Sequence, residues 1–276
     1  MPKKAQCNII LFMIDLHVHS VYSDGTCSIE EILQKARDLN LKQLAITDHN
    51  ILKGSIVASQ ISDIDFIVGT ELSVGYGKAE VHLLGYFPNG SNYKNTQFII
   101  NEGEAYKKVA ILEMIEKLND MGININISEV NGFAKGIINR VHICMALMKH
   151  GYVTSINEGF DKYVGEKCEA YVERKTVTIF EAIDAIHKDG GIAVIAHPYE
   201  YDDVGEIDDF LYDIMNMIDG IECFHPSANK SQSEHLTSIA LDNKKIITGG
   251  SDFHGDNKPN INLGMMNVDD KYSIKR

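Results

Sequence analysis

The segment from Ile14 to Ser20 alternates apolar and polar residues, a pattern typical of a β-strand with two different faces. On this pattern Asp15, His17 and His19 project from the same face. Two neutral imidazoles on one face form half of a metal site, because a divalent cation binds ring nitrogens at about 2.0–2.1 Å. Taken alone, the pair fits equally well a strand with two partly exposed histidines.

Seven of the 11 histidines share one local pattern, in which an apolar run ends in a polar cluster. Carboxylates stand close to several of them. An α/β barrel or open sheet assembles a site at its C-terminal face from the ends of several strands. Spacing alone therefore predicts a polynuclear site with histidine and carboxylate ligands. The histidines are His17, His19, His49, His82, His197, His225 and His254, and the carboxylates are Asp24, Asp48, Glu71 and Asp252.

Predicted strands and helices alternate along most of the chain, and these elements must position the histidines and carboxylates. Ser28 and Glu31 are spaced as a capping box, which predicts a helix that runs to about Asn40. Seven apolar runs predict strands, and the helical segments between them indicate crossovers of a parallel barrel. The predicted strands lie at 14–20, 43–47, 65–72, 80–87, 191–197, 220–224 and 245–252, and the predicted helices at 28–40, 51–62, 178–189, 206–218 and 231–243.

Residues 95–172 interrupt this alternation. Apolar residues at helical spacing predict one amphipathic helix over 104–123 and another over 139–152. We therefore predict a small helical subdomain at 95–172, inserted where it would lie over the open face of the barrel and cap the substrate. The catalytic barrel would comprise 13–94 and 173–270, and residues 1–12 would be an N-terminal extension.

Composition narrows the class of partner. The 276 residues include 39 acidic and 26 basic side chains, and the net charge of −13 argues against binding of duplex DNA or long nucleic acid. No apolar run reaches about 18 residues, and the opening segment lacks a signal-peptide cleavage site, so neither a membrane span nor secretion is predicted. The five cysteines form no CxxC pair, which suits the reduced cytoplasm.

Seven motifs follow one another along the chain: DLHVHSVYSDGT at 15–26, ITDHN at 46–50, GTEL at 69–72, VHLLGY at 81–86, IAHP at 195–198, IECFHP at 221–226 and GGSDFHG at 249–255. Together they resemble the PHP (polymerase and histidinol phosphatase) domain family of metal-dependent phosphoesterases. The resemblance extends from residue 14 to about residue 268 and is highly specific. It implies an α/β fold, a distorted seven-stranded (β/α) barrel with an inserted helical subdomain.

The same resemblance implies three divalent metals per chain. Mn²⁺ is favoured by the family, and Zn²⁺ or Fe²⁺ would also suit mixed nitrogen and oxygen ligands. The first metal would take His17, His19 and Asp252, with Glu71 bridging to a second metal that also takes His82 and His197, and the third would take Asp24, His49 and His254.

A site with several clustered metals indicates a phosphoesterase in which a metal-bound hydroxide is the nucleophile. The segment at 95–172 resembles the insert of the branch that hydrolyses nucleotide monoesters, including nucleoside 3′,5′-bisphosphates and 5′-monophosphates. There Arg140 and His142 would contact substrate phosphate, and the alternative is that both are exposed at a helix N-terminus. His225 is the candidate proton donor to the leaving oxygen, or a phosphate-binding residue. Asp48 is a further catalytic candidate, expected to orient a ligand imidazole.

Three other functions remain open. A 5′–3′ exoribonuclease acting on short RNA ends would meet the same phosphate pattern as a bisphosphatase, and a histidinol phosphatase would use the same metals. A metal-binding interaction module is the non-enzyme alternative, but nine filled ligand positions argue against it. The expected partner is therefore a small phosphorylated nucleotide or a short RNA end, and the sequence indicates no oligomeric state.

Overall fold

A computed structural model of the protein describes residues 13–90, 92–134 and 138–275. Contacts within the chain divide it into two units. The barrel unit comprises Met1–Phe98 and Thr178–Arg276, and the helical unit comprises Ile99–Val177. The predicted N-terminal extension at 1–12 lies outside the described residues.

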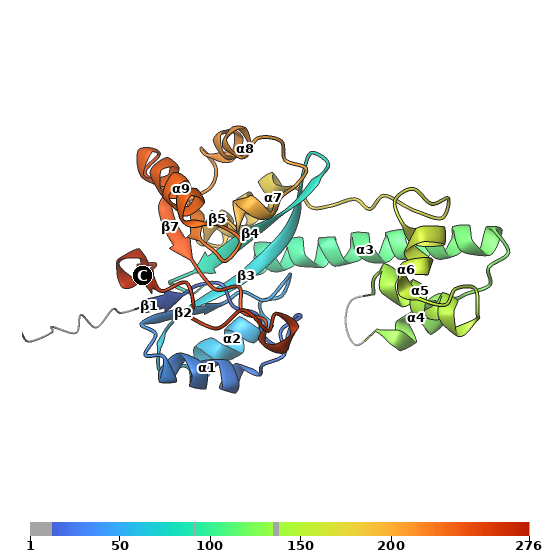
Figure 1. The fold of residues 1–276 in the computed structure, drawn as a ribbon, viewed down its shortest axis with the longest axis horizontal. Helices are drawn as coiled ribbons and strands as arrows, with labels where there is room; N and C mark the ends of the chain where they lie inside the picture. The colour runs from blue at the N-terminus through green and yellow to red at the C-terminus, as the bar shows by residue number, and fades with distance from the viewer. Residues whose placement is uncertain (1–12, 91, 135–137, 276) are drawn as a thin grey trace, which may run out of the picture. The chain divides into compact units, whose positions relative to one another are not determined.

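The barrel unit is built around an eight-stranded sheet with the order β7-β6-β5-β4-β3-β2-β1-β8 (Figure 1). Strands β1 to β7 correspond to the seven predicted strands, so the predicted α/β barrel is confirmed. The short β8 was not predicted, and it pairs antiparallel with β1. The strands are β1 (Met13–Asp15), β2 (Gln43–Ile46), β3 (Asp65–Tyr76), β4 (Ala79–Phe87), β5 (Ile192–Ile195), β6 (Gly220–Phe224), β7 (Ile246–Gly249) and β8 (Val268–Asp269).

Backbone hydrogen bonds join the segment after β1 to the end of β7 and to the residues that follow it, so the strand at one edge of the sheet meets the strand next to the other edge. The amide of Leu16 donates to the carbonyl of Gly249 at 3.2 Å. The amide of Asp252 donates to the carbonyl of His17 at 2.8 Å. The sheet is thus nearly a closed barrel, and motifs from opposite ends of the sequence share one end of it.

The direction of β4 differs from the all-parallel barrel predicted from the sequence. β4 pairs antiparallel with β3, from Val68 opposite Phe87 to Tyr76 opposite Ala79, and it is antiparallel to β5 as well. The reason is the short connection at 77–78, where Gly77 adopts a φ of +58°. Two residues suffice for a hairpin, whereas a parallel partner requires a crossover of a dozen residues or more.

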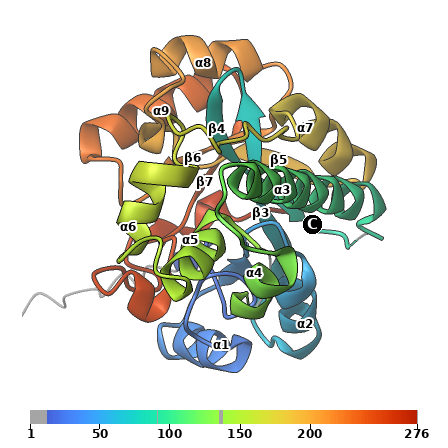
Figure 2. The same cartoon turned by 90° about the vertical axis from the view of Figure 1, so that its right-hand side faces the viewer.

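Five helices surround the strands of the barrel unit (Figure 2). Three of them begin with a capping box, in which Ser28, Thr178 or Asn229 exchanges hydrogen bonds with the residue three positions later. Inside the barrel, Leu16, Ile67, Leu84 and other residues form a buried cluster. The helices are α1 (Ile29–Asp38), α2 (Lys53–Ile61), α7 (Ile179–Lys188), α8 (Ile207–Ile214) and α9 (Lys230–Asp242), with short turns η2 (Pro198–Glu200), η3 (Gly255–Asn257) and η4 (Asp270–Tyr272).

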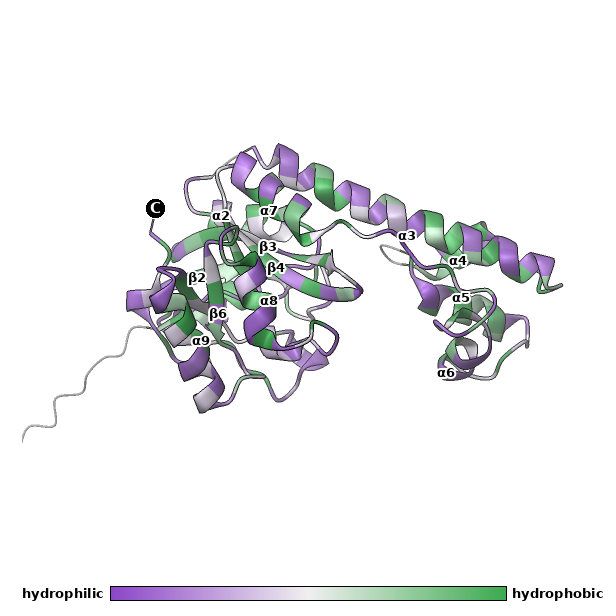
Figure 3. Ribbon diagram, turned by 90° about the horizontal axis from the view of Figure 1, so that it is seen from above, coloured by the Kyte–Doolittle hydropathy of each residue, from purple (hydrophilic) through white to green (hydrophobic). Residues whose placement is uncertain are grey.

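The helical unit contains the helices that the sequence predicts at 104–123 and 139–152. Hydrophobic and hydrophilic residues are interspersed along α3 (Figure 3). Ile115, Leu118, Ile143 and Leu147 lie in its core. A role for this unit as a cap over substrate stays a prediction. Its elements are α3 (Lys94–Asp120), which begins in the barrel unit, α4 (Ile127–Phe133), α5 (Arg140–Lys149), α6 (Ile156–Gly159) and η1 (Phe160–Val164).

Of the helices in the described ranges, none has the length and hydropathy needed to cross a bilayer.

Candidate metal centre

The carboxylate of Glu71 lies at the centre of the candidate site. Its side chain is 1% exposed and projects from the middle of β3. Five imidazoles from four different segments surround it. Its Oε2 lies 3.1 Å from His17 Nε2, 3.1 Å from His19 Nε2 and 3.2 Å from His49 Nδ1, and its Oε1 lies 2.8 Å from His82 Nδ1 and 2.9 Å from His197 Nε2.

The structure brings all nine predicted metal ligands into this cluster. Around Glu71 they fall into overlapping groups that resemble the predicted three sets, with two differences. His19 is close to the third set as well as the first, and His49 of the third set groups with Glu71 and His82 of the second. That these residues bind metal stays a prediction. The groups with ligand atoms near one another include His17, His19, Glu71 and Asp252; His49, Glu71 and His82; and His19, Asp24, His49 and His254.

Strand ends position these side chains. His17 and His19 follow β1, His49 follows β2, and His197 follows β5. Two of the predicted ligand residues have unusual backbone conformations, with φ of +21° at His197 and +54° at Asp252. Residues other than glycine rarely adopt positive φ, and such conformations are found where surrounding structure fixes a functional side chain.

Hydrogen bonds fix the tautomers of two imidazoles in the form that a metal requires. His17 Nδ1 lies 3.0 Å from Glu222 Oε1, and His254 Nδ1 lies 2.8 Å from the carbonyl oxygen of Asp252. Because both partners accept, each Nδ1 carries the proton of the neutral ring, so that loss of any second proton would leave a lone pair on Nε2 for a metal.

Several buried ring nitrogens also have no hydrogen-bond partner among the described residues. They include His19 Nε2, His49 Nδ1 and His197 Nδ1. A buried polar atom without a partner is costly, and a bound cation would satisfy such atoms together. The donor set therefore fits divalent metals.

Ionisable groups in the cluster are strongly coupled. Burial alone would lower the pKa of His17 and His19, but neighbouring carboxylates outweigh it, so the pKa of His17 lies well above its usual value and that of His19 rises to about 9. Burial would raise the pKa of Glu71, but the imidazoles hold it well below its usual value. At His49 burial is the largest effect and lowers the pKa to about 4. Protons on His17 and His19 thus compete with any cation that binds.

Glu222 is a site residue that the sequence reasoning missed. It is buried, its Oε1 binds His17 Nδ1 at 3.0 Å, and its Oε2 accepts the amide of His197 at 2.8 Å. One carboxylate therefore orients two predicted ligands. A charged residue within the apolar run GIECF was the signal that could have revealed it.

Two other residues near the motifs face away from the cluster. Asp15, predicted on the same face as His17 and His19, accepts hydrogen bonds from the amide and hydroxyl of Ser251 at 2.9 and 2.6 Å, so it holds the loop after β7 in place. Cys223 is buried, and burial raises the pKa of its thiol to about 12. It is therefore a small buried thiol of the barrel core.

The two predicted catalytic residues have different surroundings. His225 Nδ1 accepts the amide of Ser227 at 3.1 Å, so a neutral ring carries its proton on Nε2, which lies 3.4 Å from Asp252 Oδ2. Asp48 is buried and accepts hydrogen bonds from the amide of Ser20 at 2.7 Å and the hydroxyl of Ser23 at 2.8 Å. Asp48 is thus linked to an imidazole through Ser23, whose hydroxyl lies 3.4 Å from His19 Nδ1. Both catalytic roles stay predictions.

Arg140 and His142 lie in the first turn of α5, in the helical unit. The guanidinium of Arg140 lies over the rings of Phe160 and Tyr171, 5.2 and 5.5 Å from their centroids. His142 Nδ1 accepts the amide of Asn139 at 3.0 Å, which leaves its Nε2 free of this capping interaction. Their contact with substrate stays a prediction.

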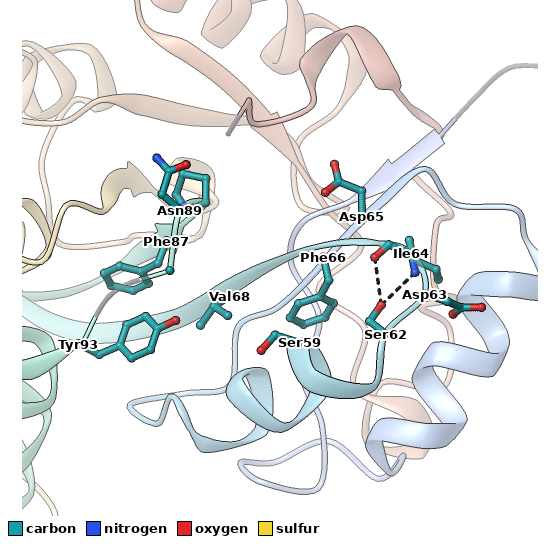
Figure 4. A pocket seen from close by; sticks show the side chains of 12 residues that line it. Ser59, Ser62, Asp63, Ile64, Asp65, Phe66, Val68, Phe87, Asn89 and Tyr93 are labelled. Carbon is teal, nitrogen blue, oxygen red and sulfur yellow. Dashed lines mark hydrogen bonds between the residues drawn. The ribbon is translucent and has the colours of Figure 1, made fainter.

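A cavity of about 710 Å³ lies apart from this cluster (Figure 4). Phe66 and Val68 of β3 line it together with Phe87 and Tyr93, whose rings meet edge to face. None of its lining residues is a predicted metal ligand. The candidate site therefore rests on the cluster of imidazoles and carboxylates and not on this cavity.

A nearly closed α/β barrel whose strand ends gather imidazoles and carboxylates defines the class of metal-dependent barrel hydrolases. The profile of the PHP domain matches residues 15–249. The chain belongs to this family, and the resemblance seen in its motifs is confirmed. It is a PHP metal-dependent phosphoesterase.

Relatives with different named activities match the chain. It is 30% identical over 245 residues to a 5′-3′ exoribonuclease of Haemophilus influenzae, covering 87% of this chain and 89% of the relative. It is 26% identical over 255 residues to a phosphoribosyl 1,2-cyclic phosphate 1,2-diphosphodiesterase of Eggerthella lenta, covering 87% and 94%. It is 30% identical over 203 residues to a 3′,5′-nucleoside bisphosphate phosphatase of Chromobacterium violaceum, covering 68% of each.

The fold also matches a solved structure. A crystal structure assigned to a metal-dependent phosphoesterase from Bifidobacterium adolescentis superposes with a TM-score of 0.70 at 27% sequence identity, covering 94% of this chain and 93% of that one. Sequence and fold comparisons therefore agree on the family.

Proposed function

We propose that this protein hydrolyses the phosphate monoester of a small nucleotide, a nucleoside 3′,5′-bisphosphate or 5′-monophosphate. The observation that carries the proposal is the buried Glu71 carboxylate with five imidazole nitrogens within 3.2 Å. Such a cluster suits several divalent metals and gives phosphoester hydrolysis without a side-chain nucleophile. The bisphosphate phosphatase among the relatives supports the choice of a nucleotide.

The metals are proposed to be three per chain, with Mn²⁺ as the preferred ion. When bound, they lower the pKa of water and offset negative charge on phosphoryl oxygens. Glu222 would keep the ring of His17 and the backbone of His197 in place, since it bonds to both. The ligands would be His17, His19, Glu71 and Asp252 for the first metal, Glu71, His82 and His197 for the second, and Asp24, His49 and His254 for the third.

The substrate would enter where the ligands are exposed. The side chains of His49 and His82 are 26% and 25% exposed and that of Asp24 is 56% exposed, whereas His17 and His19 are fully buried. Of the two roles predicted for His225, phosphate binding fits this tautomer, because the amide of Ser227 keeps the proton of the neutral ring on Nε2, where it would donate a hydrogen bond to the substrate phosphate. Arg140 would bind the second phosphate of a bisphosphate substrate.

A 5′–3′ exoribonuclease acting on short RNA ends is the second candidate. The observation in its favour is the coverage of the Haemophilus relative, which is matched over 89% of its length against 68% for the bisphosphate phosphatase. A 5′-phosphorylated RNA end carries the same pattern of phosphates as a 3′,5′-bisphosphate. The net charge of −13 restricts this candidate to short strands.

The test is release of product from a substrate panel in the presence of Mn²⁺. The panel contains adenosine 3′,5′-bisphosphate, AMP, histidinol phosphate and a short 5′-phosphorylated RNA, with Glu71→Gln as the inactive control. We expect the highest kcat/KM on the bisphosphate or on AMP. Cleavage of the RNA with no turnover of the mononucleotides would replace the proposal by the exoribonuclease, and selective hydrolysis of histidinol phosphate would overturn both.

A further inference from the structure

Lys258 lies at the edge of the candidate metal centre, directly after η3. Its ammonium donates a hydrogen bond to Oδ2 of Asp252. The lysine side chain is 41% exposed, whereas that of Asp252 is 6% exposed. The positive charge therefore stands where the solvent meets the buried cluster.

The two oxygens of Asp252 face different groups. Oδ1 faces the predicted ligands, at 3.5 Å from His17 Nε2 and 3.2 Å from His19 Nε2. Oδ2 faces His225 Nε2 at 3.4 Å and also accepts from Lys258. The imidazole of His225 and the ammonium of Lys258, which come from different segments, thus face the same anionic oxygen.

A purely structural ion pair explains Lys258 poorly. Asp252 already lies within 3.5 Å of nitrogens of four imidazoles, so its charge is compensated without the lysine. An ion pair with a partner this exposed contributes little to stability, because solvent screens it. A lysine ammonium is a point charge on a flexible stem of four carbons, so it can move from a carboxylate oxygen to a nearby phosphoryl oxygen.

Other groups beside the entrance would repel a phosphate. The side chain of Asp24 is 56% exposed and that of Glu200 is 40% exposed. Glu200 Oε1 lies 3.8 Å from His225 Nδ1. A phosphate dianion that passes these carboxylates gains from a cationic donor of the protein itself. Lys258 provides such a donor, and the Nε2 of His225 is directed at the same oxygen position.

We propose that Lys258, together with the imidazole of His225, binds a non-bridging oxygen of the scissile phosphate. The inference rests on the proposed phosphomonoester reaction and adds to it a substrate-binding residue that no motif indicated. Since every substrate carries the scissile phosphate, Lys258 should act on all of them, unlike Arg140, which is proposed to bind a second phosphate.

The kinetic test compares Lys258→Met, which keeps the length of the side chain without its charge, with Lys258→Arg, which keeps the charge. Lys258→Met should lower kcat/KM by roughly 10- to 150-fold on both p-nitrophenyl phosphate and adenosine 3′,5′-bisphosphate, the effect of losing one charge-assisted hydrogen bond. Lys258→Arg should recover part of the loss. The matched control is Lys230→Met, because Lys230 is 90% exposed on α9, and it should behave as wild type.

Titration of inorganic phosphate into the Mn²⁺-loaded protein gives a second readout that needs no turnover. Phosphate affinity should fall by a similar factor in Lys258→Met, while the Mn²⁺ content per chain stays that of the wild type. Loss of Mn²⁺ together with activity would overturn the proposal, because Lys258 would then act by holding Asp252. Unchanged kcat/KM and unchanged phosphate affinity would overturn it as well.

Failure of the proposed function gives a different result. If the wild type hydrolyses p-nitrophenyl phosphate but no nucleotide, the nucleotide assignment is wrong and the simple ester still tests Lys258. If the wild type hydrolyses neither, the phosphomonoester proposal is wrong. The phosphate titration of wild type and Lys258→Met then decides the role of Lys258 by itself.

Discussion

Binding of the metals should release protons, and His19 allows the size of this effect to be worked out. Its imidazole is fully buried, and neighbouring carboxylates raise its pKa to about 9. At pH 7 the ring is therefore protonated, about two pH units below its pKa. Displacing that proton lowers the apparent affinity for the metal about 100-fold, or about 2.7 kcal/mol at about 1.36 kcal/mol per unit.

The sign follows from the direction of the shift. A raised pKa keeps His19 protonated below pH 9, so its proton alone should make the affinity for Mn²⁺ rise about tenfold per unit between pH 7 and pH 8. The proton of His17, whose pKa is raised as well, should make the rise steeper. Glu71 and Asp252 contribute no protons in this range, because neighbouring imidazoles outweigh the effect of burial and hold both pKa values below their usual range.

Calorimetric titration of Mn²⁺ into chelator-treated protein measures this directly. Titrations at pH 7 in two buffers of different ionisation enthalpy should show the release of at least one proton per chain. His19→Gln should remove one released proton, whereas His235→Gln should not, since His235 is 46% exposed and pairs with Asp208 on the surface. No proton release and an affinity independent of pH would refute the reasoning.

Three substitutions test other parts of the site. Glu71→Gln should leave the fold intact by circular dichroism but lower turnover by orders of magnitude, and near-normal phosphatase activity would make Glu71 an ordinary buried acid. Glu222→Gln should weaken Mn²⁺ affinity by about 10- to 100-fold, as measured by titration, because it orients His17; an unchanged affinity would contradict that role. Arg140→Ala should lower kcat/KM by roughly 10- to 150-fold on adenosine 3′,5′-bisphosphate and leave p-nitrophenyl phosphate unaffected. Equal loss on both would instead place Arg140 at the scissile phosphate or in the fold.

The strands and the gathering of histidines and carboxylates in one site could be predicted because both depend on local pattern, whereas the division of the ligands among three metals was implied by the family resemblance. The alternation through His17 and His19 and the polar ends of the other apolar runs are visible in the sequence itself. The barrel then brings them together, since strand ends meet at one end of it. The cluster around Glu71 lies where that argument puts it.

Other features depend on contacts between distant segments, which one sequence does not display. The direction of β4 follows from the two-residue connection after Tyr76, a signal that the expectation of helical crossovers concealed. Glu222 lies within an apolar run, and only the fold places it beside His17. Lys258 stands in a loop without periodicity, and its partner Asp252 is set by the turn after β7.

The most direct test of the central claim is the metal content of the protein, measured by mass spectrometry after purification without chelator and after saturation with Mn²⁺. The three overlapping groups of ligands around Glu71 predict more than one ion per chain, up to three at saturation, with phosphatase activity rising as the ions are restored. At most one ion per chain under saturating Mn²⁺ would contradict the account.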